Sequence, residues 1–212
     1  PCGVPFTGLG PNCFDGCDVV VDFSLPEGLD EALDHIEGRP LVTGTTGLTP
    51  ETLDKLTQYA GKAPVLAAAN FSTGLNVLLA LVKQAAAALP DAEVEIVETH
   101  HRYKKDAPSG TALALGNKVA EARQTTLDKV ARYGREGISD HRDPQDIVFH
   151  AIRMGNVVGE HTVHLGESGE TLALSHSATS RNTFADGALR AAKWIFQRSP
   201  GQYTMAEMLG LT

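Results

Sequence analysis

The first half of the chain alternates short apolar runs with helix-like segments, and this alternation limits the possible folds more than any other feature of the sequence. The apolar runs carry few charges, as strands do when a parallel sheet buries both of their faces. The segments between them are long enough to form the crossover helices that join parallel strands. We therefore predict an α/β fold with a parallel sheet. The expected strands are Asp18–Phe23, Pro40–Thr45, Pro64–Asn70 and Glu93–Thr99, and the expected helices are Pro26–Ile36, a segment from Pro50 to about Gly61, and a segment that ends near Leu89.

The second of these helices has the clearest start. Thr49 has the side chain of an N-cap, Pro50 suits the first helical position, and Glu51 places an acid near the positive end of the helix dipole. We therefore expect this helix to begin at Pro50.

The pattern changes after a helix expected over Ser109–Gln124. Three strand-like runs then follow one another with short turns between them, which is typical of antiparallel pairing. We expect a mixed or antiparallel sheet in a second domain, followed by an amphipathic helix over Thr183–Arg198. The three runs are Ile147–Arg153, Val157–Gly166 and Thr171–Ala178, and the hairpin-type turns are Met154-Gly155-Asn156 and Glu167-Ser168-Gly169-Glu170.

Composition argues against several classes of partner. The formal net charge of -8 and the pI of about 5.4 argue against nucleic acid or an anionic membrane. The longest apolar stretch, Leu75–Leu89, contains Lys83 and Gln84 and is too short to span a bilayer. The three cysteines all lie in the first 17 residues, and this odd number favours free thiols. Because the chain opens with Pro1 rather than Met, we expect that residues precede it in the full protein.

Two groups of possible metal ligands occur, and we expect neither to bind a metal. Cys13 and Cys17 are followed by no second Cys or His pair at a suitable spacing. His161 and His164 could form a site with His176, but they are three residues apart on an expected strand. Their side chains then point to opposite faces of the sheet.

Three consecutive expected strands end in small, hydroxylated or amide residues. The carboxyl ends of parallel strands share one edge of an open α/β sheet, where such folds bind ligands. Gly44 and Gly47 allow a ligand to approach the backbone, Thr45 and Thr46 offer hydroxyl groups, and Asn70 offers both a donor and an acceptor. Taken alone, the segment from Gly44 to Gly47 is equally well read as a strand-to-helix turn. Three such ends in succession favour a cofactor crevice.

The segment Glu98–Gly116 (ETHHRYKKDAPSGTALALG) gathers positive charge in an acidic chain. His100 lies at the end of an expected strand, and Ser109-Gly110-Thr111 begins a helix whose free N–H groups suit a carboxylate. Lys104 can add charge and donate a proton, and His100 or His101 can act as an acid near neutral pH. Each residue also has a structural reading, as a helix cap, a solvated lysine or a packed histidine. Their combination beside a crevice indicates a site that binds and protonates a small dianionic substrate.

These motifs together resemble the dihydrodipicolinate reductase family, the nicotinamide-dependent enzymes of bacterial lysine and diaminopimelate synthesis. The resemblance covers nearly all of residues 18–196, and the His-His loop with its Asp-Ala-Pro-Ser-Gly-Thr tail is its most specific part. The matching motifs are Val21-Asp22-Phe23-Ser24-x-Pro26, Thr43-Gly44-Thr45-Thr46-Gly47, Ala68-Ala69-Asn70-Phe71-Ser72, Glu98-x-His100-His101-x-x-Lys104-x-Asp106-Ala107-Pro108-Ser109-Gly110-Thr111, Gly159-Glu160-His161-Thr162 and Ser180-Arg181-x-Thr183-Phe184-Ala185-x-Gly187.

The resemblance implies a role for each candidate residue. His100 corresponds to a proton donor or acceptor and Lys104 to a catalytic proton donor, whereas His101 and the amides of Gly110 and Thr111 correspond to contacts with the carboxylates of the substrate. In this reading NADH or NADPH delivers a hydride to a cyclic unsaturated dicarboxylate, and 4-hydroxy-tetrahydrodipicolinate yields tetrahydrodipicolinate and water. The positions that correspond to cofactor contacts are Phe23, Ser24, Gly44, Thr45, Thr46, Ala68, Ala69, Asn70 and Phe71.

The resemblance also implies the domain organisation. Residues 1–71 and 182–212 correspond to a Rossmann-like dinucleotide-binding domain, and residues 72–181 to an α+β domain with a mixed sheet for substrate binding and oligomerisation. Such enzymes are cytoplasmic homotetramers joined through that sheet. The first strand, glycine fingerprint and helix of the family have no counterpart in this sequence, so we expect an N-terminally incomplete dinucleotide-binding domain. Two other functions fit the same residues, a non-catalytic module that binds a dicarboxylate and an aspartate-dehydrogenase-like reductase of an open-chain imine.

Overall fold

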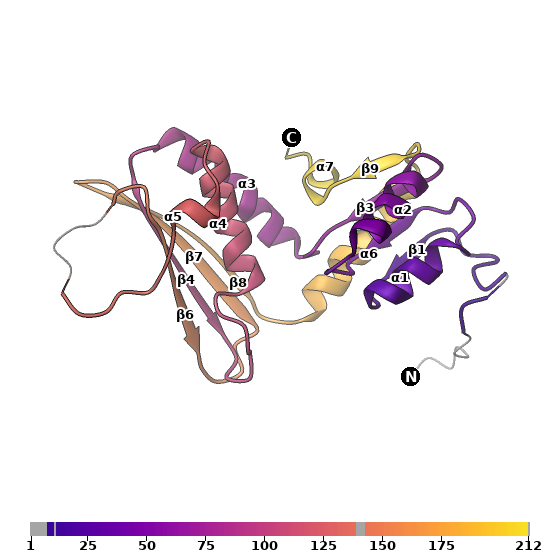
Figure 1. Ribbon diagram of the computed structural model, residues 1–212, viewed down its shortest axis with the longest axis horizontal. Coiled ribbons are helices and arrows are strands. Elements are labelled where there is room, and N and C mark those ends of the chain that lie inside the picture. Colours follow the sequence, from indigo (N-terminus) through magenta and orange to yellow (C-terminus); the bar gives the residue numbers. More distant parts are fainter. Residues whose placement is uncertain (1–7, 11, 139–142, 212) are drawn as a thin grey trace. The chain divides into compact units, whose positions relative to one another are not determined.

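The computed structural model describes residues 8–10, 12–138 and 143–211 of the chain. The chain forms two compact units, each with its own sheet (Figure 1). Unit 1 consists of residues 1–73 and 184–212, and unit 2 consists of residues 74–183. Cys2 lies outside the described residues, and Cys13 and Cys17 are free thiols.

Unit 1 contains a four-stranded parallel sheet with the strand order β1-β2-β3-β9. Each of the first two strands leads into a helix and then into the strand beside it, as the apolar alternation of the sequence predicts. The elements of unit 1 are β1 (Val20–Asp22), α1 (Pro26–Leu33), β2 (Leu41–Thr43), α2 (Pro50–Ala60), β3 (Pro64–Ala67), α6 (Asn182–Ile195), β9 (Gly201–Tyr203) and α7 (Met205–Leu209).

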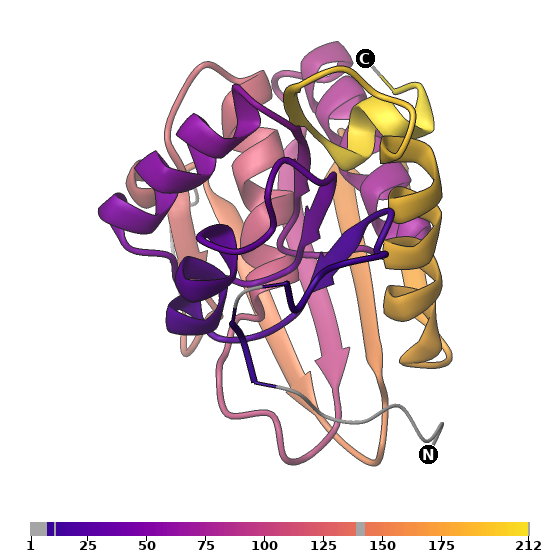
Figure 2. The same ribbon diagram turned by 90° about the vertical axis from the view of Figure 1, so that its right-hand side faces the viewer.

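Helices cover both faces of this parallel sheet. Neighbouring residues of β2 point to opposite faces, so that Leu41 packs with α1 and α2 whereas Val42 packs with α6 and α7. Figure 2 shows α1 and α2 on one side of the strands and α6 and α7 on the other. The carboxyl ends of β1, β2 and β3 therefore lie together at one edge, as parallel strands require.

The start of α2 confirms the expected capping chemistry. The Thr49 side chain accepts a hydrogen bond from the Thr52 amide at 3.2 Å, and Pro50 is the first helical residue. The helix ends at Ala60 with Gly61 as its C-cap.

Unit 2 contains a five-stranded mixed sheet with the strand order β5-β6-β4-β7-β8. The central strand β4 pairs in parallel with β6 and antiparallel with β7. The elements of unit 2 are α3 (Thr73–Ala88), β4 (Glu93–His100), α4 (Gly110–Ala122), α5 (Leu127–Val130), β5 (Ala131–Tyr133), β6 (Ile147–Arg153), β7 (Gly159–Gly166) and β8 (Thr171–Ala178).

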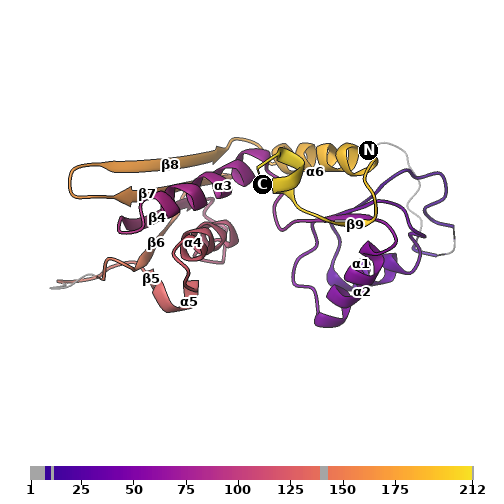
Figure 3. The ribbon, with the colours of Figure 1, turned by 90° about the horizontal axis from the view of Figure 1, so that it is seen from above.

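Helices α3 and α4 cover one face of the mixed sheet (Figures 1 and 3). Along β4, the side chains of Val94, Ile96, Glu98 and His100 are buried on this face, and the residues between them point to the other face. The buried face is apolar at Val94 and Ile96 and becomes charged at Glu98. The same strand thus contributes to the hydrophobic core at one end and to a polar site at the other.

The structure corrects two expectations about pairing. Glu93–Thr99 was expected to continue the first parallel sheet, but it belongs to the mixed sheet of unit 2, and β9 is the fourth strand of the parallel sheet. The segment Met154-Gly155-Asn156 does not close a hairpin, because β4 lies between β6 and β7. The second expected hairpin is correct, since β7 and β8 pair antiparallel.

Gly187 is required where α6 packs against the backbone after β3. A Cβ atom at this position would lie 1.8 Å from the carbonyl oxygen of Phe71. We predict that Gly187→Ala lowers the free energy of unfolding by about 1–3 kcal/mol or more, even though alanine favours helix by up to about 1 kcal/mol. Urea denaturation measures the change.

Gly169→Ala is the matched control, since a Cβ atom there meets nothing within 4 Å. Equal stabilities of the two variants would show that the close approach at Gly187 is not a constraint.

Candidate active site

The C-terminal end of β4 carries two polar residues that face the helix-covered side of the sheet. Glu98 is 1% exposed and His100 is 9% exposed. Both point inward because they continue the alternation that buries Val94 and Ile96. A buried carboxylate costs several kcal/mol unless other groups compensate its charge.

Four donors compensate the carboxylate of Glu98. Arg153 on β6 donates from both terminal nitrogens, at 2.8 Å to each oxygen. The Ser109 amide donates at 2.9 Å and His100 Nδ1 lies 2.6 Å from Oε2. Arg153 also donates to the carbonyl oxygen of Asp106, at 2.7 Å. The carboxylate therefore connects β4, β6 and the loop between β4 and α4.

These contacts determine the ionisation of both side chains. Burial raises the pKa of Glu98, but the hydrogen bonds from Arg153, His100 and Ser109 outweigh this and place the pKa below its ordinary value. Burial lowers the pKa of His100, and Glu98 opposes this, while the charges of Lys104 and Arg153 lower it further; the net pKa lies below 6.5. At neutral pH Glu98 is an anion and His100 is a neutral imidazole.

Helix α4 begins beside this carboxylate with two free backbone donors. Ser109 is its N-cap, and the Ser109 side chain accepts from the Ala112 amide at 3.1 Å. The amides of Gly110 and Thr111 form no hydrogen bond with the described residues, whereas those of Ser109 and Ala112 are both used. The expected anion site is thus reduced to the N–H groups of Gly110 and Thr111, at the positive end of the helix dipole.

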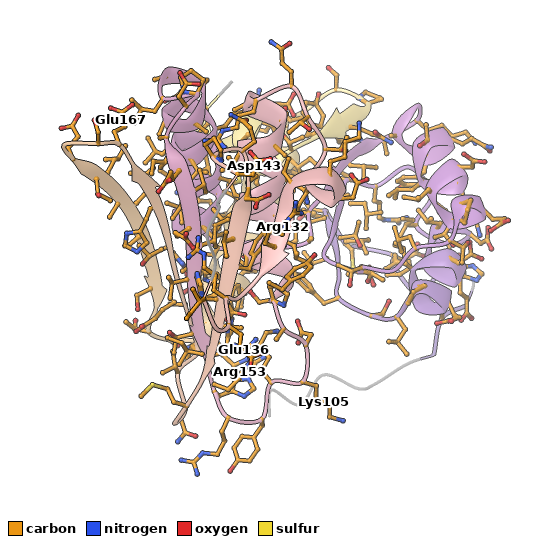
Figure 4. All side chains as sticks on the ribbon, turned by 60° about the vertical axis from the view of Figure 1, so that its left-hand side comes forward. Lys105, Arg132, Glu136, Asp143, Arg153 and Glu167 are labelled. Atoms are coloured by element: carbon orange, nitrogen blue, oxygen red, sulfur yellow. The ribbon has the colours of Figure 1, made fainter. Side chains whose placement is uncertain are left out.

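The loop between β4 and α4 carries the cationic residues of the motif. Lys104 Nζ lies 2.8 Å from Asp106 Oδ1, and the lysine side chain is 21% exposed. Lys105 is exposed and extends outward from the loop (Figure 4). His101 is partly buried, and its Nδ1 is buried without a hydrogen-bond partner among the described residues. Lys104, not Lys105, belongs to the polar cluster.

His161 on β7 joins the cluster from the other side of β4. Its ring meets the ring of His100 edge-on with 5.0 Å between centroids, and its Nε2 lies 3.0 Å from Ser109 Oγ. His161 pairs across the ladder with His176, so both point to the helix-covered face, whereas His164 points to the opposite face. Burial is the main cause that lowers the pKa of His161 to about 4, and it is therefore neutral.

In unit 1, a second buried carboxylate organises the ends of β1 and β2. Asp22 Oδ2 accepts from the hydroxyls of Thr43 and Thr45, both at 2.7 Å, and Oδ1 accepts from the hydroxyl and amide of Ser24, at 2.5 and 3.1 Å. Burial raises the pKa of Asp22, but these hydrogen bonds outweigh it and leave the pKa below 3.8. The hydroxyl protons of Ser24 and Thr45 thus point to Asp22, and a ligand at this edge meets these hydroxyls as acceptors.

The aromatic residues of the same edge lie around the glycine turn. The Phe23 ring packs directly on Gly44, where a Cβ atom would lie 2.2 Å from the ring. The rings of Phe23 and Phe71 meet edge-on at 5.2 Å, and Phe23 is 55% exposed whereas Phe71 is buried. Of the other candidates in unit 1, Thr46 and Ala69 are exposed and Ala68 and Asn70 are partly buried.

The described residues offer neither a metal centre nor a membrane span. No group of three or more His, Cys, Asp and Glu side chains within residues 8–10, 12–138 and 143–211 could hold a metal ion. None of the helices in the described part of the chain is both long and apolar enough to cross a bilayer.

The sequence did not identify all members of these clusters. The sequence places Glu98 in a motif without a role of its own and offers His161 only as part of a motif and as a rejected metal ligand, and it assigns no role to Arg153 or Asp22. Arg153 and Glu98 are 55 residues apart in the chain, so no local spacing predicts their contact. The one available signal was the alternation of β4, which places a charged residue on a buried face.

Two family models match the chain. The model described as "Dihydrodipicolinate reductase, N-terminus" matches residues 1–71, and the model described as "Dihydrodipicolinate reductase, C-terminus" matches residues 74–209. The two matches together include every candidate residue named above.

Individual proteins are similar over the same length. A 4-hydroxy-tetrahydrodipicolinate reductase of Halorhodospira halophila is 49% identical over 212 residues, which cover 99% of this chain and 79% of the relative. One of Pseudoalteromonas atlantica is 45% identical over the same shares. A solved structure, dipicolinate-bound dihydrodipicolinate reductase from Paenisporosarcina sp. TG-14, matches with a TM-score of 0.71 and 26% identity and covers 90% of this chain and 72% of that one.

The buried His161 predicts a pH dependence of stability. Its pKa is about 4 in the folded chain and 6.5 when unperturbed, so the unfolded state binds more protons between these values. Stability therefore falls as the pH drops from 6.5 to about 4, by up to about 3 kcal/mol from this residue. Urea denaturation at a series of pH values should show a smaller decline for His161→Asn than for the unaltered protein. Parallel declines for the two proteins would contradict the assignment.

Proposed function

Because the chain belongs to the dihydrodipicolinate reductase family, we propose that it reduces 4-hydroxy-tetrahydrodipicolinate to tetrahydrodipicolinate with a nicotinamide cofactor, in lysine and diaminopimelate biosynthesis. The observation that carries the proposal is the polar cluster at the end of β4. It combines a neutral histidine, a lysine and two free helix N–H groups around one buried carboxylate.

The substrate is a small dicarboxylate, and unit 2 offers donors suited to its charge. The free amides of Gly110 and Thr111 are suited to one carboxylate, because they lie at the positive end of α4. His101 has a ring nitrogen without a partner among the described residues, and we assign it to the substrate as well. Dipicolinate is the ligand bound by the similar solved structure, and it carries two carboxylates on one ring.

Lys104 and His100 are the proposed catalytic residues, with different tasks. Lys104 is the proton donor, and its pairing with Asp106 keeps the ammonium group within the loop. His100 exchanges a proton through the nitrogen that does not face Glu98. Both residues lie beside α4 and can act on a substrate whose carboxylate binds there.

The nicotinamide cofactor supplies the hydride, and the edge of unit 1 fits such a ligand. The exposed ring of Phe23, the glycine turn beneath it and the hydroxyls oriented by Asp22 present one aromatic surface and several acceptors. We assign cofactor contacts to Phe23 and Ser24 at the end of β1, to Gly44, Thr45 and Thr46 after β2, and to Ala68, Ala69, Asn70 and Phe71 after β3. The cofactor is NADH or NADPH.

We further propose that the enzyme is a cytoplasmic homotetramer joined through the mixed sheet. Among the described elements of unit 2, α3 and α4 cover one face of this sheet, and the other face carries Val97, Thr162 and Ile152. Ile152 is 42% exposed.

Replacement of the catalytic residues should remove turnover without loss of the fold. Lys104→Ala and His100→Asn should each lower kcat by about a hundredfold or more, since each variant loses a positioned acid or base. Oxidation of NADH or NADPH in the presence of the cyclic substrate measures the rate. Lys105→Ala is the matched control, because Lys105 is exposed and should leave the rate near that of the unaltered protein.

Other outcomes identify the other candidate functions. Binding of the dicarboxylate without cofactor oxidation would indicate a non-catalytic binding module. Oxidation with an open-chain imine instead of the cyclic substrate would indicate an aspartate-dehydrogenase-like enzyme. Full activity in both the Lys104 and His100 variants would refute the proposed mechanism.

The oligomer has a separate test. Val97→Arg places a charge on the uncovered face of the central strand, and the variant should have a lower molar mass by light scattering than the unaltered tetramer. A monomeric unaltered protein, or a tetrameric variant, would contradict the assignment of this face.

A further inference from the structure

We propose that Glu98 is a positioning residue that fixes His100 in the tautomer with the proton on Nδ1. We also propose that Arg153 weakens the effect of Glu98 on His100, because it binds the same carboxylate. The catalytic consequence rests on the proposed function, whereas the tautomer is a property of the free protein. His100 then presents Nε2 as the nitrogen that accepts a hydrogen bond or a proton.

The hydrogen-bond count around Glu98 determines the tautomer. An ionised carboxylate can only accept, so the 2.6 Å contact between Glu98 Oε2 and His100 Nδ1 requires a proton on Nδ1. Glu98 is kept ionised by the three other donors, which are both terminal nitrogens of Arg153 and the amide of Ser109. A neutral His100 therefore has its lone pair on Nε2.

The second nitrogen of His100 is free to meet a ligand. No described residue forms a hydrogen bond with His100 Nε2, and the side chain keeps 11% exposure. Gly159 lies beside this nitrogen, and a Cβ atom there would come within 3.0 Å of it. A glycine at this position thus leaves space at the nitrogen that the tautomer makes basic.

Arg153 lowers the pKa of His100, whereas Glu98 raises it. When Nε2 takes a proton, the imidazolium forms an ion pair with Glu98, and the proton stays on the ring as Glu98 remains ionised. Arg153 is positive and binds both oxygens of Glu98, so it weakens this ion pair and also repels the imidazolium. Glu98 thus favours the protonation of His100 and Arg153 disfavours it, in addition to the effects of burial and of the Lys104 charge.

Among the other charged or titratable groups around His100, Lys104 also lowers its pKa through charge repulsion. Lys104 and Asp106, on the loop, pair with each other at 2.8 Å. His161, on β7, meets the ring edge-on and has a pKa of about 4, so it is neutral at pH 7. Glu98 is thus the one described anion in hydrogen-bond contact with His100.

The same carboxylate couples His100 to the anion site. Glu98 Oε1 accepts from the Ser109 amide, and Ser109 caps the helix that offers the amides of Gly110 and Thr111. One side chain thus fixes the orientation of the proton-exchanging ring and the start of the substrate-binding helix.

Nitrogen-15 NMR of histidine-labelled protein tests the proposal without a ligand. The two ring nitrogens of His100, assigned with His100→Asn, should show the proton on Nδ1 at neutral pH. Glu98→Gln should lower the pKa of His100, because the anion is lost. It should also weaken the preference for the Nδ1 proton, because a glutamine amide can donate to Nδ1 as well as accept from it. Arg153→Gln should raise the pKa of His100, because a repelling charge is lost. Glu121→Gln is the matched control and should leave the His100 signals unchanged, since Glu121 on α4 pairs at the surface with Lys83 of α3 and Lys118 of α4.

Shifts of the His100 pKa in opposite directions in the two variants would support the proposal. A general loosening of the structure would instead move the His100 pKa in the same direction in both variants. A proton on Nε2 in the unaltered protein, or shifts of one sign in both variants, would overturn it. If Glu98→Gln does not fold, the His100 tautomer in the unaltered protein and the His100 pKa in Arg153→Gln still test the proposal.

Activity supplies an independent reading. In the active enzyme, the limb of the pH–rate profile that reports His100 should move to lower pH in Glu98→Gln and to higher pH in Arg153→Gln, and kcat of Glu98→Gln should fall by about tenfold or more. An unaltered protein without turnover on the cyclic substrate would refute the proposed function, while the NMR experiment would still decide the tautomer.

Discussion

The structure of unit 2 depends on the compensation of one buried charge, the carboxylate of Glu98. Four hydrogen bonds from three parts of the chain reach its two oxygens. Removal of one partner from a buried ion pair typically costs about 3–5 kcal/mol, so β4, β6 and the start of α4 are fixed to one another at this point. The candidate catalytic residue His100, the free amides of α4 and the loop with Lys104 all take their positions from this arrangement.

Unit 1 also contains a buried carboxylate that is compensated by hydrogen bonds, that of Asp22. Asp22 ends β1 and accepts three hydroxyl hydrogens and one amide, which fixes the turn after β2. In both units an ionised carboxylate near the carboxyl end of a strand is satisfied from within, so that its charge organises neighbouring groups instead of meeting a ligand. For Ser24 and Thr45 this changes the expected chemistry, because their hydroxyl protons are already used.

The sequence predicted elements well where the signal was local. The capping residues Thr49 and Pro50 define the start of α2, and the β7–β8 turn lies where it was expected. The insertion of β4 between β6 and β7 was missed, because alternation along a strand reports its faces but not its neighbours. The short strands β5 and β9 were missed because they lack the continuous apolar runs that revealed the equally short β1 and β2. For the candidate site, the loop motif proposed His100, Lys104, Gly110 and Thr111, whereas the contacts of Arg153 and His161 with this loop and strand depend on pairing between distant strands.

The proposed function requires that the cluster around Glu98 bind a small molecule with two carboxylates. Calorimetric titration of the protein with pyridine-2,6-dicarboxylate and with pyridine-2-carboxylate tests it most directly. The dicarboxylate should bind about tenfold or more tightly than the monocarboxylate, because the second carboxylate adds a charge-assisted contact worth at least about 1.5 kcal/mol. Equal affinities for the two compounds, or no heat with either, would contradict it.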